Sequence, residues 1–365
     1  MNIAGPILCV VGARPNLMKM APLLRAFAAH APAIPARLVH TGQHYDRAMD
    51  GQVFEDLGLP VPDAHLGVGS GTHAVQTAQA MERFEPVLDA ARASAVLVVG
   101  DVNSSLACAL VAAKKGVPVI HVEAGLRSGD WSMPEEINRV LTDRLSDLLF
   151  TTERSAAANL AREGIDPARV HFAGNVMIDT LMANLGRAKP PRDAPGGGYA
   201  VLTLHRPSNV DDPRMLERWL ATLIKASERL PIVFPVHPRT AQHIQASGSA
   251  RALGQARVRL QEPLGYLDML GLMRGAKLVL TDSGGIQEET TALGVPCLTL
   301  RENTERPVTV EEGTNTVVGT DPARVLAALD DIIANGGKRG RRPEGWDGHA
   351  AERIAAVIAT RFGAA

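Results

Sequence analysis

The chain has 365 residues, of which 45% are hydrophobic and 21% are charged, and its formal net charge is −1. This length allows two domains of ordinary size, each with its own core, and the composition is that of a soluble globular protein. No run of Lys or Arg is present, which argues against nucleic acid as the main partner. No apolar stretch reaches the ~18 residues that a membrane span needs, and no basic leader precedes the first apolar run. We therefore expect a cytoplasmic protein that does not bind membranes.

Short apolar runs alternate with amphipathic stretches from one end of the chain to the other. In the first half, this pattern predicts strands at residues 7–11, 36–41, 95–100, 118–123 and 147–152. In the second half, it predicts strands at residues 199–205, 231–237, 257–262, 277–282 and 296–300. Strand–helix alternation with continuously apolar strands indicates parallel sheets covered by helices on both faces. We predict an α/β protein of two doubly wound Rossmann-like domains with a cleft between them.

The segment 186–198 is the one stretch rich in Pro and Gly, so we expect the interdomain linker near it. The predicted domains are residues 1–174 and 175–348, and a last helix near 349–363 is expected to pack back on the first domain. Cys9, Cys108 and Cys297 lie inside apolar patterns without CxxC spacing, and this indicates buried thiols rather than disulfides or metal ligands.

Polar residues recur where the predicted strands end. Ligands of open parallel sheets bind beyond the carboxyl ends of the strands. The residues at these positions are Arg14, Gln43, His44, Asp101, Glu123, His205, His237, Asp282 and Ser283. If both edges face one cleft, a single site holds several carboxylates and several cations.

The stretch TDSGGIQEET, residues 281–290, stops an apolar run at an acid, a hydroxyl and two glycines. Ser283 is placed to cap a helix, and Gly284 and Gly285 let a ligand oxygen approach backbone N–H groups. A helix N-terminus with free donors favours phosphate, and Glu288 or Glu289 could reach hydroxyl groups beside it. The alternative is an ordinary capped helix whose first glutamates complement the helix dipole.

Cations and histidines at other strand ends allow two interpretations each. Arg14 and Lys19 lie one turn apart at a helix start. They could bind an anion together, or they could be an ordinary helix-start arginine and a solvent-exposed lysine. His205 and His237 each follow a strand and precede a turn that contains Pro. Each could contact a ligand, or it could be a structural histidine bonded to a backbone carbonyl.

The acids of the first half differ in what their positions imply. Glu123 ends a buried strand, where a carboxylate is costly unless it is paired or used, and this favours a function. Asp101 could cap the helix that follows it, and Glu135 and Glu136 could merely complement a helix dipole after Pro134.

The sequence patterns of a metal site, a dinucleotide site and a serine hydrolase are absent. His121 and Glu123 share a strand face, but no third ligand stands at a metal-binding spacing. No GxGxxG follows the first strand and no G-x-S-x-G turn is present, which argues against a bound dinucleotide and a serine hydrolase.

Several motifs in order along the chain resemble one family. They are VVGARPNLMKMAPL, TGQHYD, GDVNSSLA, HVEAGLRSGD, MPEEINR, GNVMIDT, TDSGGIQEE and RENTERP, which together span residues 10–307. In this combination the chain resembles the non-hydrolysing UDP-N-acetylglucosamine 2-epimerases. The resemblance implies a GT-B fold, reversible conversion of UDP-GlcNAc to UDP-ManNAc through release of UDP, no cofactor, no metal, and a homodimer.

The resemblance also assigns roles, residue by residue. Asp101, Glu123 and Glu135 match the essential acids, and His205 matches the histidine near the diphosphate. Arg14, Lys19 and Arg306 match cationic contacts to the substrate, and His237 is a further candidate for binding it. Ser283, Gly284 and Gly285 match the diphosphate cradle, and Glu289 matches the carboxylate that holds the ribose.

Three other functions remain open from the sequence. A GT-B glycosyltransferase would share the fold, although the acids of the first half suit proton chemistry on the sugar itself. A 2-epimerase could act on a related donor, such as a diacetamido uronic acid. A UDP-sugar sensor without activity is the third, and it would have little use for several carboxylates beside a diphosphate.

Overall fold

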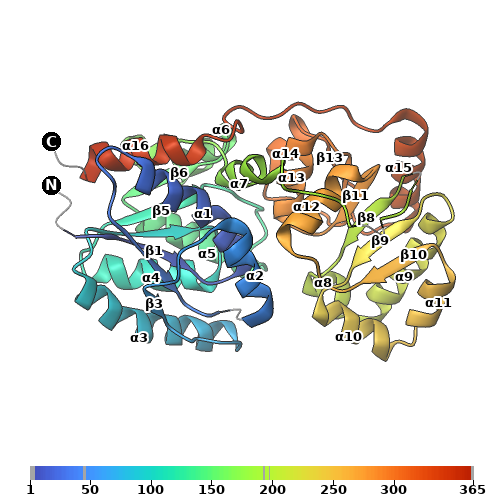
Figure 1. Cartoon of the computed structure of the whole chain (residues 1–365), viewed down its shortest axis with the longest axis horizontal. Helices are drawn as coiled ribbons and strands as arrows, with labels where there is room; N and C mark the ends of the chain where they lie inside the picture. The colour runs from blue at the N-terminus through green and yellow to red at the C-terminus, as the bar shows by residue number, and fades with distance from the viewer. Residues whose placement is uncertain (1–4, 44–46, 192–193, 197, 363–365) are drawn as a thin grey trace. The chain divides into compact units, whose positions relative to one another are not determined.

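The computed structural model describes residues 5–43, 47–191, 194–196 and 198–362. The chain forms two compact units, one made of Met1–Ala183 with Glu344–Ala365 and the other of Asn184–Pro343. Each unit is a parallel sheet covered by helices (Figure 1).

The first unit holds a seven-stranded sheet in the order β3-β2-β1-β4-β5-β6-β7. Its strands are β1 (Ile7–Val11), β2 (Ala36–His40), β3 (Ala64–His65), β4 (Ala95–Val99), β5 (Val119–Ala124), β6 (Leu148–Thr151) and β7 (Val170–Phe172). Its helices are α1 (Arg14–Ala29), α2 (Arg47–Leu57), α3 (His73–Ala91), α4 (Asn103–Lys114), α5 (Pro134–Leu145), α6 (Arg154–Arg162), α7 (Val176–Asn184) and α16 (Ala350–Phe362), with a 3-10 turn at Pro167–Arg169. Helices α1 and α16 pack together, as do α3, α4 and α5 (Figure 1).

The second unit holds a six-stranded sheet in the order β10-β9-β8-β11-β12-β13. Its strands are β8 (Ala200–Thr203), β9 (Ile232–Pro235), β10 (Val258–Gln261), β11 (Leu278–Thr281), β12 (Cys297–Thr299) and β13 (Asn315–Val317). Its helices are α8 (Pro207–Val210), α9 (Pro213–Ser227), α10 (Pro238–Ala246), α11 (Ala250–Gln255), α12 (Tyr266–Gly275), α13 (Gly284–Leu293), α14 (Pro307–Glu311) and α15 (Pro322–Asn335). Among the described residues, no helix is both long and apolar enough to cross a bilayer.

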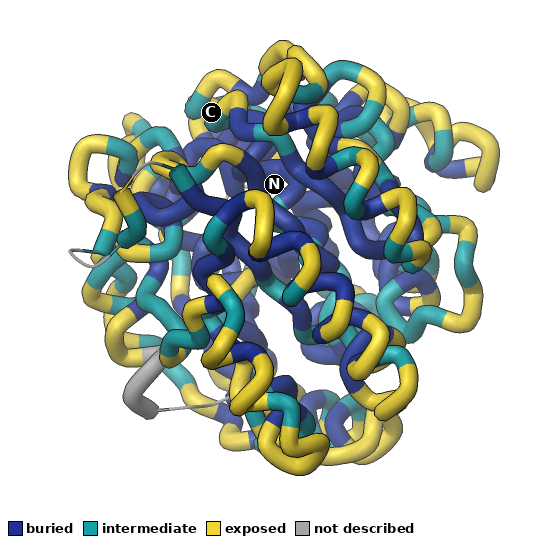
Figure 2. Tube along the Cα trace, turned by 90° about the vertical axis from the view of Figure 1, so that its right-hand side faces the viewer, coloured by how far each residue is buried: buried dark blue, intermediate teal, exposed yellow. Residues whose placement is uncertain are grey.

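The central strands are buried on both faces, as their continuous apolar runs predict. Strand β1 pairs in parallel with β2 and β4, so that Cys9 lies between Leu38 and Leu97. In the second unit, Trp219 of α9 and Phe234 of β9 belong to one buried cluster beneath the helices. Figure 2 shows the result, with buried backbone inside and exposed turns on the outer sides of the helices. These two cores fix the strand ends, and with them the loops that carry polar residues.

The first unit extends further along the chain than the predicted boundary between residues 174 and 175. Helix α7 belongs to it because Thr180 donates a hydrogen bond to the carbonyl of Met18 in α1 at 2.6 Å. Asp179 of α7 also caps α16, since its carboxylate accepts the amides of Ala350 and Ala351 at 3.1 and 2.7 Å. The chain re-enters the first unit at Glu344 rather than after residue 348, and its last helix packs on α1.

Candidate functional site

The first sheet has its switch point between β1 and β4, where the strand order reverses. Loops on the two sides of such a point diverge and leave a crevice at the carboxyl edge. Here, these loops lead into α1 at Arg14 and into α4 after Asp101. Asn16 joins them, because its side-chain nitrogen donates to the Val99 carbonyl at 2.9 Å and its oxygen accepts the Gly12 amide at 3.1 Å. The crevice therefore has a hydrogen-bonded floor.

Glu123 lies at this edge in an unusual backbone conformation. Its φ is +76°, which is rare for a residue other than glycine and costs on the order of 1–3 kcal/mol. Its carboxylate forms an ion pair with Lys19, and both side chains are almost completely buried. A Cβ at Gly100 would lie 3.0 Å from Lys19 Nζ and 4.0 Å from Glu123 Oε1, so this pair rests directly on Gly100. The fold thus holds a buried carboxylate beside Gly100, the residue before Asp101, at an energetic cost, as functional sites do.

Asp101 is held by a charged face of α5. Its Oδ2 lies 2.5 Å from Arg139 Nη2, and Arg139 Nη1 lies 2.7 Å from Glu136 Oε2. Glu136 in turn accepts the amides of Ser128 and Gly129 at 3.0 and 2.8 Å. Glu136 therefore does more than complement the helix dipole, since it fixes the backbone of the loop between β5 and α5. Sequence reasoning did not select Arg139.

The remaining predicted residues of the first unit are less enclosed. Arg14 is half-buried at the first position of α1, and Glu135 is half-buried in the first turn of α5. The structure thus brings Lys19, Glu123 and the loop of Asp101 together at one edge. His44 lies outside the described residues.

The second sheet has its switch point between β8 and β11, and the loops there place His205 beside Asp282. The fully buried Asp282 carboxylate accepts the amides of His205 and Arg206 at 3.0 and 2.9 Å and the side-chain nitrogen of Asn209 at 3.1 Å. Its Oδ1 lies 3.1 Å from Nδ1 of His205. Burial alone would raise the pKa of Asp282, but His205 and these donors outweigh it and lower the pKa to about 2. Because Asp282 occupies Nδ1, the Nε2 atom of the partly exposed His205 ring is the one that can meet a ligand.

The start of α13 has the features of an anion site. Ser283 is at the N-cap position, but among the described residues no side-chain hydrogen bond caps this helix. A Cβ at Gly284 would lie 2.4 Å from Arg306 Nη1 and 2.7 Å from Glu305 Oε1, so any larger residue there would displace these two side chains. The first amides of the helix and a guanidinium thus meet at one point, which is the arrangement that binds phosphate.

A buried charge cluster surrounds that point. Arg306 lies 2.5 Å from Glu305 through Nη1 and 2.9 Å from Glu288 through Nε. Arg301 Nη2 lies 2.8 Å from the other oxygen of Glu305. Buried charges persist only when paired, so Glu305 and Glu288 fix the orientation of Arg306. The sequence predicted Arg306 and named Glu288 as an alternative to Glu289 for binding hydroxyl groups, but it did not predict that Glu288 and Glu305 pair with Arg306.

Glu289 and His237 have different surroundings. Glu289 is buried, and burial together with a hydrogen bond to this carboxylate raises the pKa of the Tyr266 hydroxyl above its ordinary value. His237 is exposed and caps α10, with Nδ1 accepting the Arg239 amide at 3.3 Å, and its ring centroid lies 5.9 Å from that of His205. His237 thus has a structural role as a helix cap, although this contact is to a backbone amide rather than to the carbonyl that the sequence suggested.

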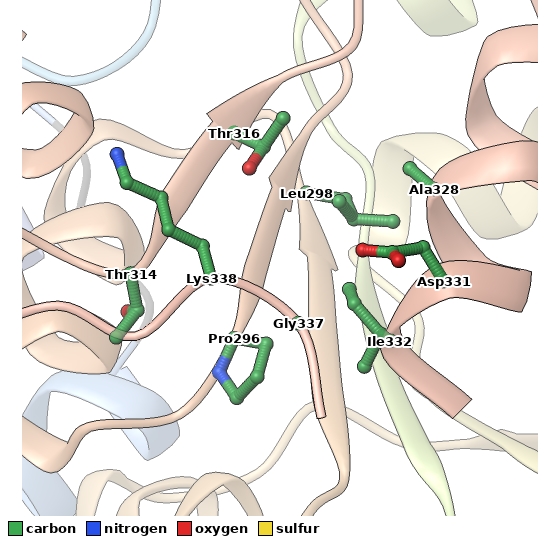
Figure 3. Close-up of a pocket in the computed structure, with 9 residues that line it drawn as sticks. All are labelled: Pro296, Leu298, Thr314, Thr316, Ala328, Asp331, Ile332, Gly337 and Lys338. Carbon is green, nitrogen blue, oxygen red and sulfur yellow. The ribbon is translucent and has the colours of Figure 1, made fainter. Parts of the chain in front are cut away.

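A separate pocket lies beside the first residues of β12 and β13 (Figure 3). His205 follows the end of the parallel strand β8, at the opposite edge of the same sheet. Asp331 and Ile332 of α15 reach toward Leu298 there, and the Lys338 ammonium donates to the Val310 carbonyl. Ligands of parallel sheets bind at the carboxyl edge, so this pocket is not the predicted site. Within the described residues, no group of three or more His, Cys, Asp or Glu side chains is placed to hold a metal ion.

Two Rossmann-like units, each with its charged side chains beyond the carboxyl ends of parallel strands, define the class of protein. The chain is an α/β protein of the GT-B fold.

Comparison with known proteins places the chain within this class. Residues 27–359 match the family model described as UDP-N-acetylglucosamine 2-epimerase. The UDP-N-acetylglucosamine 2-epimerase of Methanocaldococcus jannaschii is 40% identical over 360 residues, which cover 96% of this chain and 97% of that protein. The UDP-2,3-diacetamido-2,3-dideoxy-D-glucuronate 2-epimerase of Pseudomonas aeruginosa is 41% identical over 331 residues and 90% of each chain. A crystal structure of the M. jannaschii enzyme with UDP-GlcNAc and UDP matches with a TM-score of 0.90, covering 97% of this chain and 99% of that one.

The chain belongs to the UDP-N-acetylglucosamine 2-epimerase family. The family and the fold that the sequence predicts are confirmed.

Proposed function

We propose that this chain catalyses the reversible C2 epimerisation of UDP-GlcNAc to UDP-ManNAc. The observation that carries the proposal is Glu123, a buried carboxylate held in a costly conformation against Lys19 and beside the loop of Asp101. The 40% identity to the M. jannaschii enzyme over nearly the whole chain supports the choice of substrate.

The chemistry of C2 explains why the reaction needs both acids and an anion site. The C2 proton is not α to a carbonyl, so its removal alone would leave an unstabilised carbanion. In an elimination, a carboxylate takes the C2 proton, the C2–H electron pair forms a C1=C2 bond, and the C1–O pair leaves with UDP. Addition of UDP back to the resulting 2-acetamidoglucal, with a proton delivered to the other face of C2, completes the epimerisation. Such a route needs an acid and a base at C2 and positive charge around the departing diphosphate.

In this proposal, the first unit carries the proton transfers. Asp101 and Glu123 act at C2 as base and acid, and Glu135 assists them. Lys19 pairs with Glu123 and Arg139 pairs with Asp101, so each carboxylate has a cation that holds its position. Arg14 is a cationic contact to the substrate.

The second unit holds UDP. The start of α13, residues 283–285, and Arg306 receive the diphosphate, where helix amides and a guanidinium meet. His205, oriented by Asp282, supports the departing phosphate through Nε2. Glu289 binds the ribose hydroxyls, and His237 contributes a further polar contact.

Product analysis tests the proposal. Incubation with UDP-GlcNAc, followed by proton NMR, is expected to show UDP-ManNAc approaching equilibrium with the substrate. Release of UDP alone, or binding without turnover, would contradict the proposal.

A second candidate substrate is a UDP-linked diacetamido uronic acid, because the P. aeruginosa enzyme named for that donor is 41% identical over 90% of the chain. Its donor differs by a C3 acetamido group and a C5 carboxylate. Parallel assays with both donors distinguish the candidates, since we expect a kcat/KM higher by at least about tenfold for UDP-GlcNAc, or ~1.4 kcal/mol.

We further propose that the chain forms a homodimer through α3 and α5. Val75, Trp131, Ile137 and Leu141 are large apolar residues that are exposed in or beside these helices. A hollow lined by Ala78, Met81 and Ile137 lies among them. Such a patch suits a second copy of the chain better than solvent. Light scattering is expected to show a dimer that Leu141→Glu converts to monomer, and a wild-type monomer would contradict the proposal.

A further inference from the structure

Asp143 is a fully buried carboxylate on α5 to which the proposed mechanism assigns no role. Its Oδ1 lies 2.6 Å from His121 Nδ1, and both side chains are completely shielded from solvent. Its Oδ2 accepts the Gly125 amide at 3.0 Å and lies 2.7 Å from Arg127 Nη2. Burial alone would raise the pKa of Asp143, but His121 and Arg127 outweigh it and lower the pKa below its ordinary value. Asp143 is therefore an ionised acceptor for three donors that all come from β5 and the loop after it.

His121 carries this contact to the loop of Asp101. Its Nε2 lies 3.1 Å from the carbonyl of Gly100, the residue before Asp101. Both partners of the ring are oxygen atoms, one of the Asp143 carboxylate and one of the Gly100 carbonyl. The Gly100 amide donates to the Val122 carbonyl at 3.1 Å, and the φ of Gly100 is +65°. Gly100, the residue before Asp101, is thus held at both its amide and its carbonyl.

The Gly125 contact acts on the other acid. Gly125 lies two residues after Glu123, with φ +80°, and a Cβ there would lie 2.5 Å from the Ala156 carbonyl. Strand β5 also shifts its register against β6 between Val122 and Ala124, around Glu123. A residue held at positive φ persists only where its surroundings restrain it on both sides. The Asp143–Gly125 hydrogen bond is one such restraint, and the Lys19 ion pair is another.

We propose that Asp143 is a positioning residue that sets, through His121 and the Gly125 amide, the backbone of both proton-transfer acids, Asp101 and Glu123. The inference rests on the proposed function, because it concerns the same two acids. Asp143 itself touches neither substrate nor reacting atoms. A carboxylate displaced by 1 Å from its proton loses about 10²-fold in rate. One buried side chain that restrains both acids therefore controls the chemical step.

The test replaces only the charge of Asp143. Asp143→Asn is expected to lower kcat for C2 deuterium exchange in D₂O by about 10²-fold, while KM and the Kd for UDP change less than about threefold. Asp147→Asn is the matched control. Asp147 also accepts a β5 amide, that of Val119 at 2.9 Å, but at the opposite end of the strand, so its kcat is expected to stay within about twofold of wild type.

A second variant keeps the test decisive if Asp143→Asn folds poorly. His121→Gln is expected to lower kcat to a similar extent, and the double variant should be hardly slower than either single one, because the two residues act as a unit. Wild-type exchange in Asp143→Asn, parallel loss of UDP binding, or full additivity with His121→Gln would overturn the inference. Absence of exchange in the wild-type protein would instead overturn the proposed function, and this inference with it.

Discussion

The carboxyl edges of the two sheets handle buried charge in different ways. At the first edge, each acid has a cation from a neighbouring element, Glu123 with Lys19 and Asp101 with Arg139. At the second edge, Asp282 is turned inward against backbone amides and His205. A carboxylate that faces a side-chain cation can take up a proton when that contact opens, whereas Asp282 accepts several backbone and side-chain donors at once. The first edge therefore suits proton transfer, and the second suits holding an anion.

The largest expected effect comes from removing an acid of the first edge. Glu123→Gln is expected to lower the rate of C2 exchange by about 10³-fold, because general acid–base groups contribute 10²–10⁴-fold. UDP binding, measured by calorimetry, should change little, because the proposed UDP site lies in the second unit.

Glu85→Gln provides the control for this variant. Glu85 lies on α3 and forms an exposed ion pair with Lys115, and such pairs contribute little to stability. A near-normal rate of C2 exchange in Glu123→Gln would show that the first sheet edge is not where proton transfer takes place.

The next effect concerns the support of His205. Asp282→Asn is expected to lower kcat by about 10²-fold, because Nδ1 of His205 loses the carboxylate that orients its ring. Asp321→Asn should leave kcat unchanged, since Asp321 only caps α15 and Asn caps a helix equally well. Equal rates in the two variants would show that His205 needs no carboxylate behind it.

Asp282 is also expected to make the free energy of unfolding depend on pH. The pKa of Asp282 falls from an ordinary 3.8 to about 2, which corresponds to about 2 kcal/mol of folding free energy. Because the folded-state pKa is the lower one, this contribution is complete above pH 3.8 and is lost as the pH falls through about 2. Urea unfolding of wild type and Asp282→Asn is expected to show a difference that narrows from pH 7 to pH 2.5. A constant difference would contradict the assignment.

The smallest effect concerns the anion site. Gly284→Ala is expected to weaken UDP binding by about tenfold, or ~1.4 kcal/mol, because its Cβ would displace Arg306 and Glu305. Gly254→Ala in α11 is the control, since a Cβ there meets nothing within 4 Å. Unchanged UDP affinity in Gly284→Ala would place the diphosphate elsewhere.

The sequence predicts the long central strands well, because burial on both faces leaves a continuous apolar run. It misses β3, β7 and β13, which are two- or three-residue strands outside the centre of their sheets and carry no such run. The structure places the domain boundary between Ala183 and Asn184 rather than between residues 174 and 175. Helix α7 joins the first unit through contacts to Met18 and Ala350, which are far away in the sequence.

The candidate residues are predictable where a strand ends, since Asp101, His205 and Ser283 follow strands and Glu123 lies at the end of β5. The residues that support them are harder to find. Glu136, Arg139 and Asp143 look like a solvated helix face in sequence, yet all three are buried. Their spacing of three and four residues places them on one side of α5, but only the fold shows that this side faces the acids.

The central claim is that the C2 proton leaves to a protein carboxylate during the reaction. Incubation of the wild-type protein with UDP-GlcNAc in D₂O, followed by NMR, tests it most directly. The proposed elimination predicts deuterium at C2 in the UDP-ManNAc formed and, with time, in the remaining UDP-GlcNAc. UDP-ManNAc that appears with its original proton at C2 would contradict the claim.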